Sequence, residues 1–103
     1  MINVDDQGIG YTDFLKIFKN QPEFIKLLLK TKIDFIIDCS KVIASRKFIE
    51  KVLAHQNDVK KCLVIIIPFD KKIILNEKWN IVPTKTEAFD FISLEQIQRK
   101  LGF

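Results

Sequence analysis

The sequence has few of the residues from which catalytic and metal sites are usually built. It contains one histidine, two cysteines and three glycines among 103 residues. His55 has no second histidine and no cysteine within a helical turn, so no zinc site is predicted. Gly8 and Gly10 lack the third glycine of a dinucleotide-binding loop. We therefore expect no catalytic residues, no metal and no cofactor, and we place His55 at the surface in the last turn of a helix.

Long apolar runs are also missing. The longest, 63–67, is the size of a strand and far short of the ~20 apolar residues that cross a membrane. The first ten residues contain Asp5 and Asp6 and do not form a basic, apolar signal segment. We expect a cytoplasmic protein that does not enter a membrane.

The two cysteines and the excess positive charge do not indicate a special site. Cys39 and Cys62 lie in or beside apolar strand-like runs, where cysteine behaves as a small apolar residue. We expect both to be free thiols. The net charge of +4 comes mostly from lysines scattered along the chain, a pattern typical of a solvated surface.

Two apolar runs predict the centre of a sheet. Residues 33–39 and 62–67 are each expected to be a strand covered on both faces, because apolar residues stand at consecutive positions within them, at 35–37 and at 63–67. Between them, Ser45 opens a helix whose apolar residues fall on one face. A helix between two such strands predicts parallel pairing through a right-handed crossover. The length fits a single domain, 1–103.

The remaining elements are predicted from turn and capping residues. Residues 1–4 are expected as a short strand, and 11–18 as another strand, although the apolar spacing in 11–18 fits a helix as well. Asn20 is expected to cap a helix that ends near Lys30 and buries Phe24, Leu27 and Leu28. Residues 69–78 are irregular, with one helical turn or a loop anchored by Ile73, Ile74 and Leu75. A short strand at 80–82 is followed by a helix capped at Thr84, which is expected to bend or restart at Ser93.

Three acidic residues resemble the acidic pocket of phospho-receiver domains. Asp5, Asp6 and Asp38 would be the matching carboxylates, and clustered carboxylates suit Mg²⁺. The interval from Asp6 to Asp38 is too short for the intervening units of that family. The simpler interpretation is a turn at Asp5 and Asp6 and a strand end at Asp38.

The segment IIDCSKVIASRKFIEKVL, residues 36–53, is similar to part of the STAS family, the anti-sigma factor antagonists. That family has a strand, D-L-S-x-V, then D-S-S-G-L and a helix. Asp38, Ser40 and Val42 match the first part, and Ser45 falls where the family carries its phosphorylated serine. The resemblance implies an STAS-like α/β fold, with a mixed, mostly parallel sheet of four or five strands and four or five helices.

Ser45 has two interpretations. Ala44, Arg46 and Lys47 depart from the D-S-S-G pattern. A serine at a helix start needs no regulatory role, because its hydroxyl can cap the helix, which contributes ~1 kcal/mol. A phosphate on Ser45 would also be favoured there, because the helix N-terminus and Arg46 attract anions.

The C-terminal segment IVPTKTEAFDFISLEQIQRKLGF is similar to the ending of small bacterial proteins encoded beside ribonuclease Z and often given its name. The metal signature of that nuclease, HxHxDH, is absent.

These observations favour a non-enzymatic regulatory module that binds a protein partner. We expect the partner to dock around the phosphoacceptor-like Ser45, with contacts from Asp38, Ser40, Lys41, Arg46 and Lys47. The alternative is an accessory RNA-binding protein linked to tRNA processing. Its phosphate contacts would come from basic pairs, namely Arg46–Lys47, Lys60–Lys61, Lys71–Lys72 and Arg99–Lys100.

Overall fold

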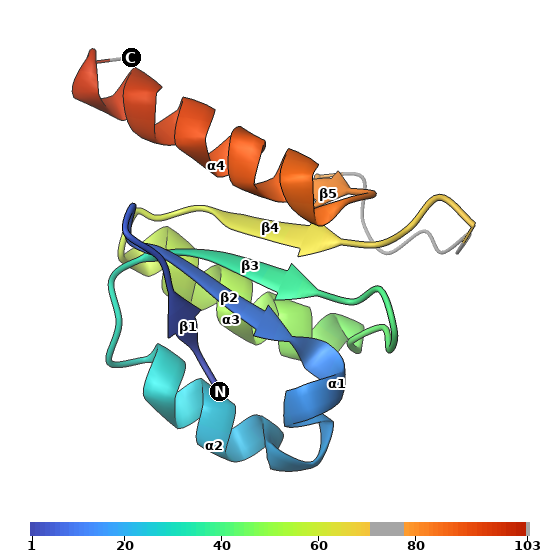
Figure 1. Cartoon of the computed structure of the whole chain (residues 1–103). Coiled ribbons are helices and arrows are strands. Elements are labelled where there is room, and N and C mark those ends of the chain that lie inside the picture. The colour runs from blue at the N-terminus through green and yellow to red at the C-terminus, as the bar shows by residue number, and fades with distance from the viewer. Residues whose placement is uncertain (71–77, 103) are drawn as a thin grey trace.

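A five-stranded mixed sheet forms the centre of the computed structural model, which describes residues 1–70 and 78–102 (Figure 1). The strands lie side by side in chain order: β1 (Asn3–Val4), β2 (Ile9–Asp13), β3 (Asp34–Asp38), β4 (Leu63–Ile66) and β5 (Ile81–Val82). β1 runs antiparallel to β2, and every other neighbouring pair is parallel. The predicted parallel pairing of the two central strands is confirmed, with Ile36 opposite Val64.

Helices cover both faces of this sheet (Figure 1). They are α1 (Phe14–Ile17), the 3-10 turn η1 (Phe18–Asn20), α2 (Gln21–Leu28), α3 (Arg46–Asp58) and α4 (Lys85–Lys100). α1, α2 and α3 pack on the face that presents Phe35 and Ile37, and α4 packs on the face that presents Ile36. All five residues of β3 are buried, as expected for a strand with covered faces.

The count of four or five helices is not confirmed. Among the described residues, α2, α3 and α4 have eight or more residues, whereas α1 and η1 have four and three. The general α/β class holds. None of the helices in residues 1–70 and 78–102 has the length and apolar character needed to cross a membrane.

The expected strand at 11–18 is wrong in its second half. The strand ends at Asp13, because the Asp13 carboxylate accepts a hydrogen bond from the Leu15 backbone N–H at 3.0 Å and caps α1. Phe14 and Ile17 are then buried on one side of a helical turn. Asn20 occupies the N-cap position before α2 but makes no side-chain cap hydrogen bond.

The expected break in the last helix is also wrong. α4 runs without interruption for 16 residues from its cap at Thr84, whose hydroxyl accepts from the Glu87 N–H at 3.2 Å. Ser93 does not restart the helix, because its hydroxyl donates instead to the Gln7 side chain at 3.1 Å.

Two single residues differ from their predicted environments. Leu27 is 44% exposed rather than buried. His55 is in the last turn of α3, as expected, but it is half-buried, with Nε2 2.9 Å from the Thr31 carbonyl oxygen. Neither cysteine forms a disulfide bond, as expected; Cys39 is buried and Cys62 is half-buried. The expected helical turn or loop at Ile73, Ile74 and Leu75 lies outside the described residues.

Candidate functional site

Ser45 is the N-cap of α3. Its backbone is extended (φ −68°, ψ 156°), and its hydroxyl accepts a hydrogen bond from the Phe48 N–H at 3.2 Å. This bond satisfies one of the N–H groups that a helix start leaves unpaired. The residue is exposed, so the cap does not remove Ser45 from solvent.

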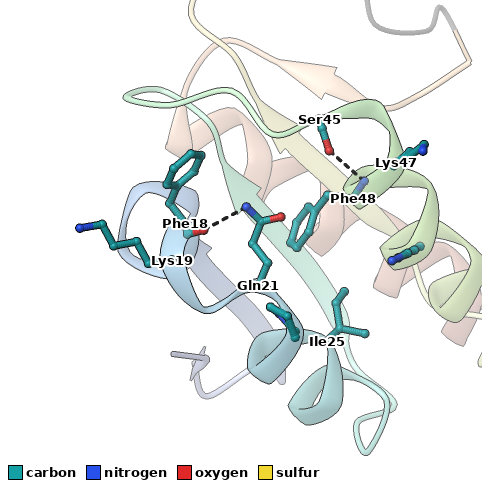
Figure 2. Close-up of a pocket in the computed structure, with 9 residues that line it drawn as sticks. Phe18, Lys19, Gln21, Ile25, Ser45, Lys47 and Phe48 are labelled. Carbon is teal, nitrogen blue, oxygen red and sulfur yellow. Dashed lines mark hydrogen bonds between the residues drawn. The ribbon is translucent and has the colours of Figure 1, made fainter.

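Ser45 lies on the wall of a groove between the η1–α2 segment and the start of α3 (Figure 2). The groove has a volume of about 540 Å³. Figure 2 shows Phe18 and Lys19 on one side and Ser45 and Lys47 on the other. We call it the Ser45 groove, and its lining residues are Phe18, Lys19, Gln21, Pro22, Ile25, Ser45, Lys47, Phe48 and Lys51.

The lining of the Ser45 groove combines apolar and basic side chains. Phe18, Ile25 and Phe48 supply much of its apolar surface, and Phe18 is 50% exposed. Lys19 and Lys51 are exposed, as is Lys47. None of the lining residues is acidic. The groove can therefore bury an apolar side chain and attract a negative charge at the same time.

Asp38 occupies a different environment from Ser45. It is the last residue of β3, 9% exposed, and its carboxylate accepts from the Tyr11 hydroxyl and from the Ser40 N–H, the latter at 2.9 Å. Burial raises the pKa of Asp38, but the hydrogen bonds from Tyr11 and Ser40 and the charge of Lys85 together outweigh it. The net effect holds the pKa below its usual range. Asp38 is thus a satisfied carboxylate that ties two strands together.

Tyr11 is the hydrogen-bond donor to Asp38 that the sequence pattern did not predict. Burial and the neighbouring carboxylate of Asp38 raise the pKa of Tyr11 above its ordinary value, so its hydroxyl stays protonated and donates. The Lys85 ammonium lies 4.2 Å from the Tyr11 ring centroid, and the Phe89 ring stacks at 6.3 Å. These contacts connect the start of α4 to β2.

The predicted partner-binding residues separate into two regions. Ser45 and Lys47 line the Ser45 groove, with Arg46 exposed between them. Lys41 belongs to another hollow, of about 480 Å³, where its ammonium pairs with the Asp13 carboxylate at 3.2 Å. Ser40 is half-buried between Asp38 and Lys41.

Several residues that line the Ser45 groove were not predicted from the sequence. Lys51 is one helical turn after Lys47, so the helical period could have placed both on one face. Phe18, Lys19 and Ile25 come from a distant segment, and only the packing of η1 and α2 beside α3 brings them there. No local sequence signal marks that contact.

The acidic-pocket hypothesis is contradicted. Among residues 1–70 and 78–102, no three histidine, cysteine, aspartate or glutamate side chains are placed to hold a metal ion. One Asp5 oxygen accepts from the N–H groups of Gln7 and Ile9, both at 2.9 Å, which closes the turn between β1 and β2. Asp5, Asp6 and Asp38 therefore do not form the magnesium site of that alternative hypothesis.

A second polar cluster lies where β3 begins. The Asp34 carboxylate, 2% exposed, accepts from Arg99 at 2.7 Å, from Gln96 at 3.0 Å and from the Cys62 N–H at 3.0 Å. Burial raises the pKa of Asp34, but these bonds together outweigh it and hold the pKa below its usual range. Burial beside Asp34 raises the pKa of Cys62 to about 12, so this thiol is a poor nucleophile. The cluster fixes the end of α4 to the sheet.

Comparisons with protein-family models, curated proteins and solved structures give no match. The observed class is an α/β protein with a mixed five-stranded sheet and a basic, partly apolar groove beside a helix start. The STAS-like resemblance therefore rests on the sequence alone.

Proposed function

We propose that the protein is a non-enzymatic regulatory module of the anti-sigma factor antagonist type, with an STAS-like fold, which acts in the cytoplasm. It binds a protein partner at the start of α3. The observation that carries this proposal is the Ser45 groove, because it places the phosphoacceptor-like serine on the wall of a hollow with an apolar floor. Concave surfaces of this kind suit a bulky side chain of a partner.

The position of Ser45 also allows regulation. The hydroxyl is exposed at the N-terminus of a 13-residue helix, with Lys47 on the same groove wall. A phosphate there would meet the positive end of the helix dipole and a lysine ammonium. It would also add negative charge inside the groove, and so change what the groove binds.

The test is a comparison of partners in the native host. Tagged wild-type protein, a groove variant (Phe18→Ser) and a distant surface variant (Gln98→Ser) are cross-linked in cells and purified, and the bound proteins are quantified by mass spectrometry. We expect at least one protein to be retained by the wild type and by Gln98→Ser but lost from Phe18→Ser. Equal recovery with all three would reject the groove as the docking site. The same spectra report any phosphate on Ser45.

A second candidate function is RNA binding linked to tRNA processing. The supporting observation is that two basic pairs distant in sequence share one end of the molecule. Lys61, Arg99 and Lys100 line one hollow of about 710 Å³, and Lys60 lines a neighbouring one together with Lys61 and Arg99. The Arg99 guanidinium, however, already pairs with Asp34 at 2.7 Å.

Filter binding of tRNA at 50 and 200 mM salt tests this candidate. RNA binding predicts affinity that falls steeply with salt and that weakens when Lys61 and Lys100 are both changed to glutamine. A pair of distant lysines, Lys26 and Lys30, changed in the same way serves as the control. Absence of binding at the lower salt concentration would remove the candidate.

A further inference from the structure

We infer that the occupant of the Ser45 groove is an acidic, amphipathic segment of the partner protein, with a bulky apolar side chain flanked by aspartate or glutamate. This inference rests on the proposed function and adds the chemistry of the partner. It follows from three features of the groove: its floor, its rim, and the charge at the start of α3.

The floor of the groove is apolar and can bind an apolar side chain of the partner. The Phe18 ring is half exposed while it packs edge-on against Phe14, with centroids 5.9 Å apart. Ile25 is half-buried, and Phe48 is buried below the groove. A leucine or phenylalanine side chain placed here would cover apolar surface that is now exposed to water.

The rim is positive, and none of the residues that line the groove is acidic. Lys19, Lys47 and Lys51 are the charged side chains among the lining residues. Lys47 and Lys51 are four residues apart on one helix face, an arrangement in which like charges repel by ~0.2–0.5 kcal/mol. A carboxylate between them would relieve that repulsion.

The start of α3 has the charge opposite to the one that a helix prefers. Its first turn contains Arg46 and Lys47 and no acidic residue, whereas the first turn of α4 contains Glu87. No acidic residue of that first turn balances the positive end of the helix dipole. Lys47 is on the wall of the groove at this end of the helix, so its ammonium adds to the positive potential that the helix N-terminus contributes there. Carboxylates of an acidic segment would balance this potential.

Selection from a random dodecamer peptide library on the immobilised full chain tests the inference. We expect the enriched peptides to contain an aromatic residue or leucine near two or more acidic residues. Binding of one synthetic enriched peptide is then measured by fluorescence anisotropy at 50 and 300 mM NaCl. The affinity is expected to fall at the higher salt concentration, because rim charges are screened.

Matched variants assign the binding site. The groove variant carries Lys19→Glu, Lys47→Glu and Lys51→Glu, and the control carries Lys30→Glu, Lys32→Glu and Lys100→Glu, so both change the net charge equally. All six lysines are exposed, and thermal melting verifies that both variants fold. We expect the groove variant to bind the peptide at least about tenfold more weakly, and the control to stay within about twofold.

The possible failures are distinguishable. If the enriched peptides are not acidic but lose binding with Phe18→Ser, the inference falls and the proposed function stands. If the lysine variant and Phe18→Ser both bind the peptides as the wild type does, or if no peptide is enriched, both the inference and the proposed function are rejected. If a single-stranded RNA oligonucleotide binds through the three groove lysines and displaces the peptides, the occupant is a nucleic acid and the inference is overturned.

Discussion

The Tyr11 hydroxyl donates a hydrogen bond to the Asp38 carboxylate and so joins the middle of β2 to the end of β3. Asp38 is buried, so its carboxylate charge is stabilised by this donor and by the Ser40 N–H. A buried carboxylate that loses a donor keeps the cost of leaving water without the compensating bond. The pair therefore helps to hold the loop that leads to Ser45.

Replacing Tyr11 by phenylalanine should lower the free energy of unfolding by about 1–2 kcal/mol, because the ring contacts stay and only the donor is lost. Urea unfolding followed by circular dichroism measures this. In an Asp38→Asn background the same change should cost less, because a neutral amide needs the donor less than a carboxylate does. Equal costs in the two backgrounds would show that the hydroxyl acts independently of Asp38.

Stability should decrease in acid through Asp34 and Asp38. The pKa of each is lower in the folded protein than its usual value, so the unfolded chain takes up protons first as the pH falls. The stabilisation is complete above the ordinary aspartate pKa of ~3.9 and is lost as the pH falls toward the folded-state values. Urea unfolding between pH 6 and pH 2.5 should show this decrease.

Asp34→Asn provides the matched variant for the acid effect. It starts from a lower stability, because Arg99 loses its carboxylate partner, but it should lose less on acidification than the wild type. The same pH dependence in both proteins would assign the effect to other carboxylates.

Gly10 is required by its neighbours rather than by a turn. It pairs with Phe35 across the sheet, and a Cβ at this position would lie 2.6 Å from Phe35 Cδ2 and 2.8 Å from Ile33 Cδ1. Gly10→Ala should therefore destabilise the fold by about 1–3 kcal/mol, the usual cost of overpacking. Urea unfolding measures the loss. Ile33→Val removes one of the two contacts and should recover part of it; an unchanged cost in that background would point to a different cause.

The sequence predicts the elements whose apolar pattern fits only one kind of secondary structure. The strands containing Phe35 and Val64 each hold three or more consecutive apolar residues, and their parallel pairing is observed. The segment 11–18 fits both periods, and the deciding feature is one polar side chain, because the Asp13 carboxylate caps a helix at Leu15. Ser93 shows the opposite error: its local pattern indicates a cap, but its hydroxyl bonds to Gln7, 86 residues away in sequence. Local patterns do not encode such a contact.

The same limit applies to the Ser45 groove. Ser45 and Lys47 are predictable, because a serine before a one-faced apolar pattern marks a helix start. The opposite wall is not predictable, because Phe18 and Ile25 reach the groove only through the packing of α2 beside α3. Half of the candidate site is therefore a property of the tertiary structure.

Capping and phosphoregulation at Ser45 can be separated by two substitutions. Ser45→Ala removes the acceptor for the Phe48 N–H and should cost about 1 kcal/mol of unfolding free energy, measured in urea. Ser45→Asp keeps an N-cap acceptor, so its stability should stay close to that of the wild type, while it places a negative charge in a groove bounded by three lysines.

Affinity for an acidic peptide that binds the groove then gives the second measurement. If charge on Ser45 regulates binding, Ser45→Asp should lower the affinity for the peptide several-fold, because the added carboxylate partly neutralises the lysine rim. Ser45→Ala should leave the affinity nearly unchanged. Thr84→Asp, the equivalent change at the cap of α4, is the control, since Thr84 also accepts a cap bond but lies outside the groove. Equal peptide affinity for Ser45→Asp and the wild type would leave capping as the whole role of this serine.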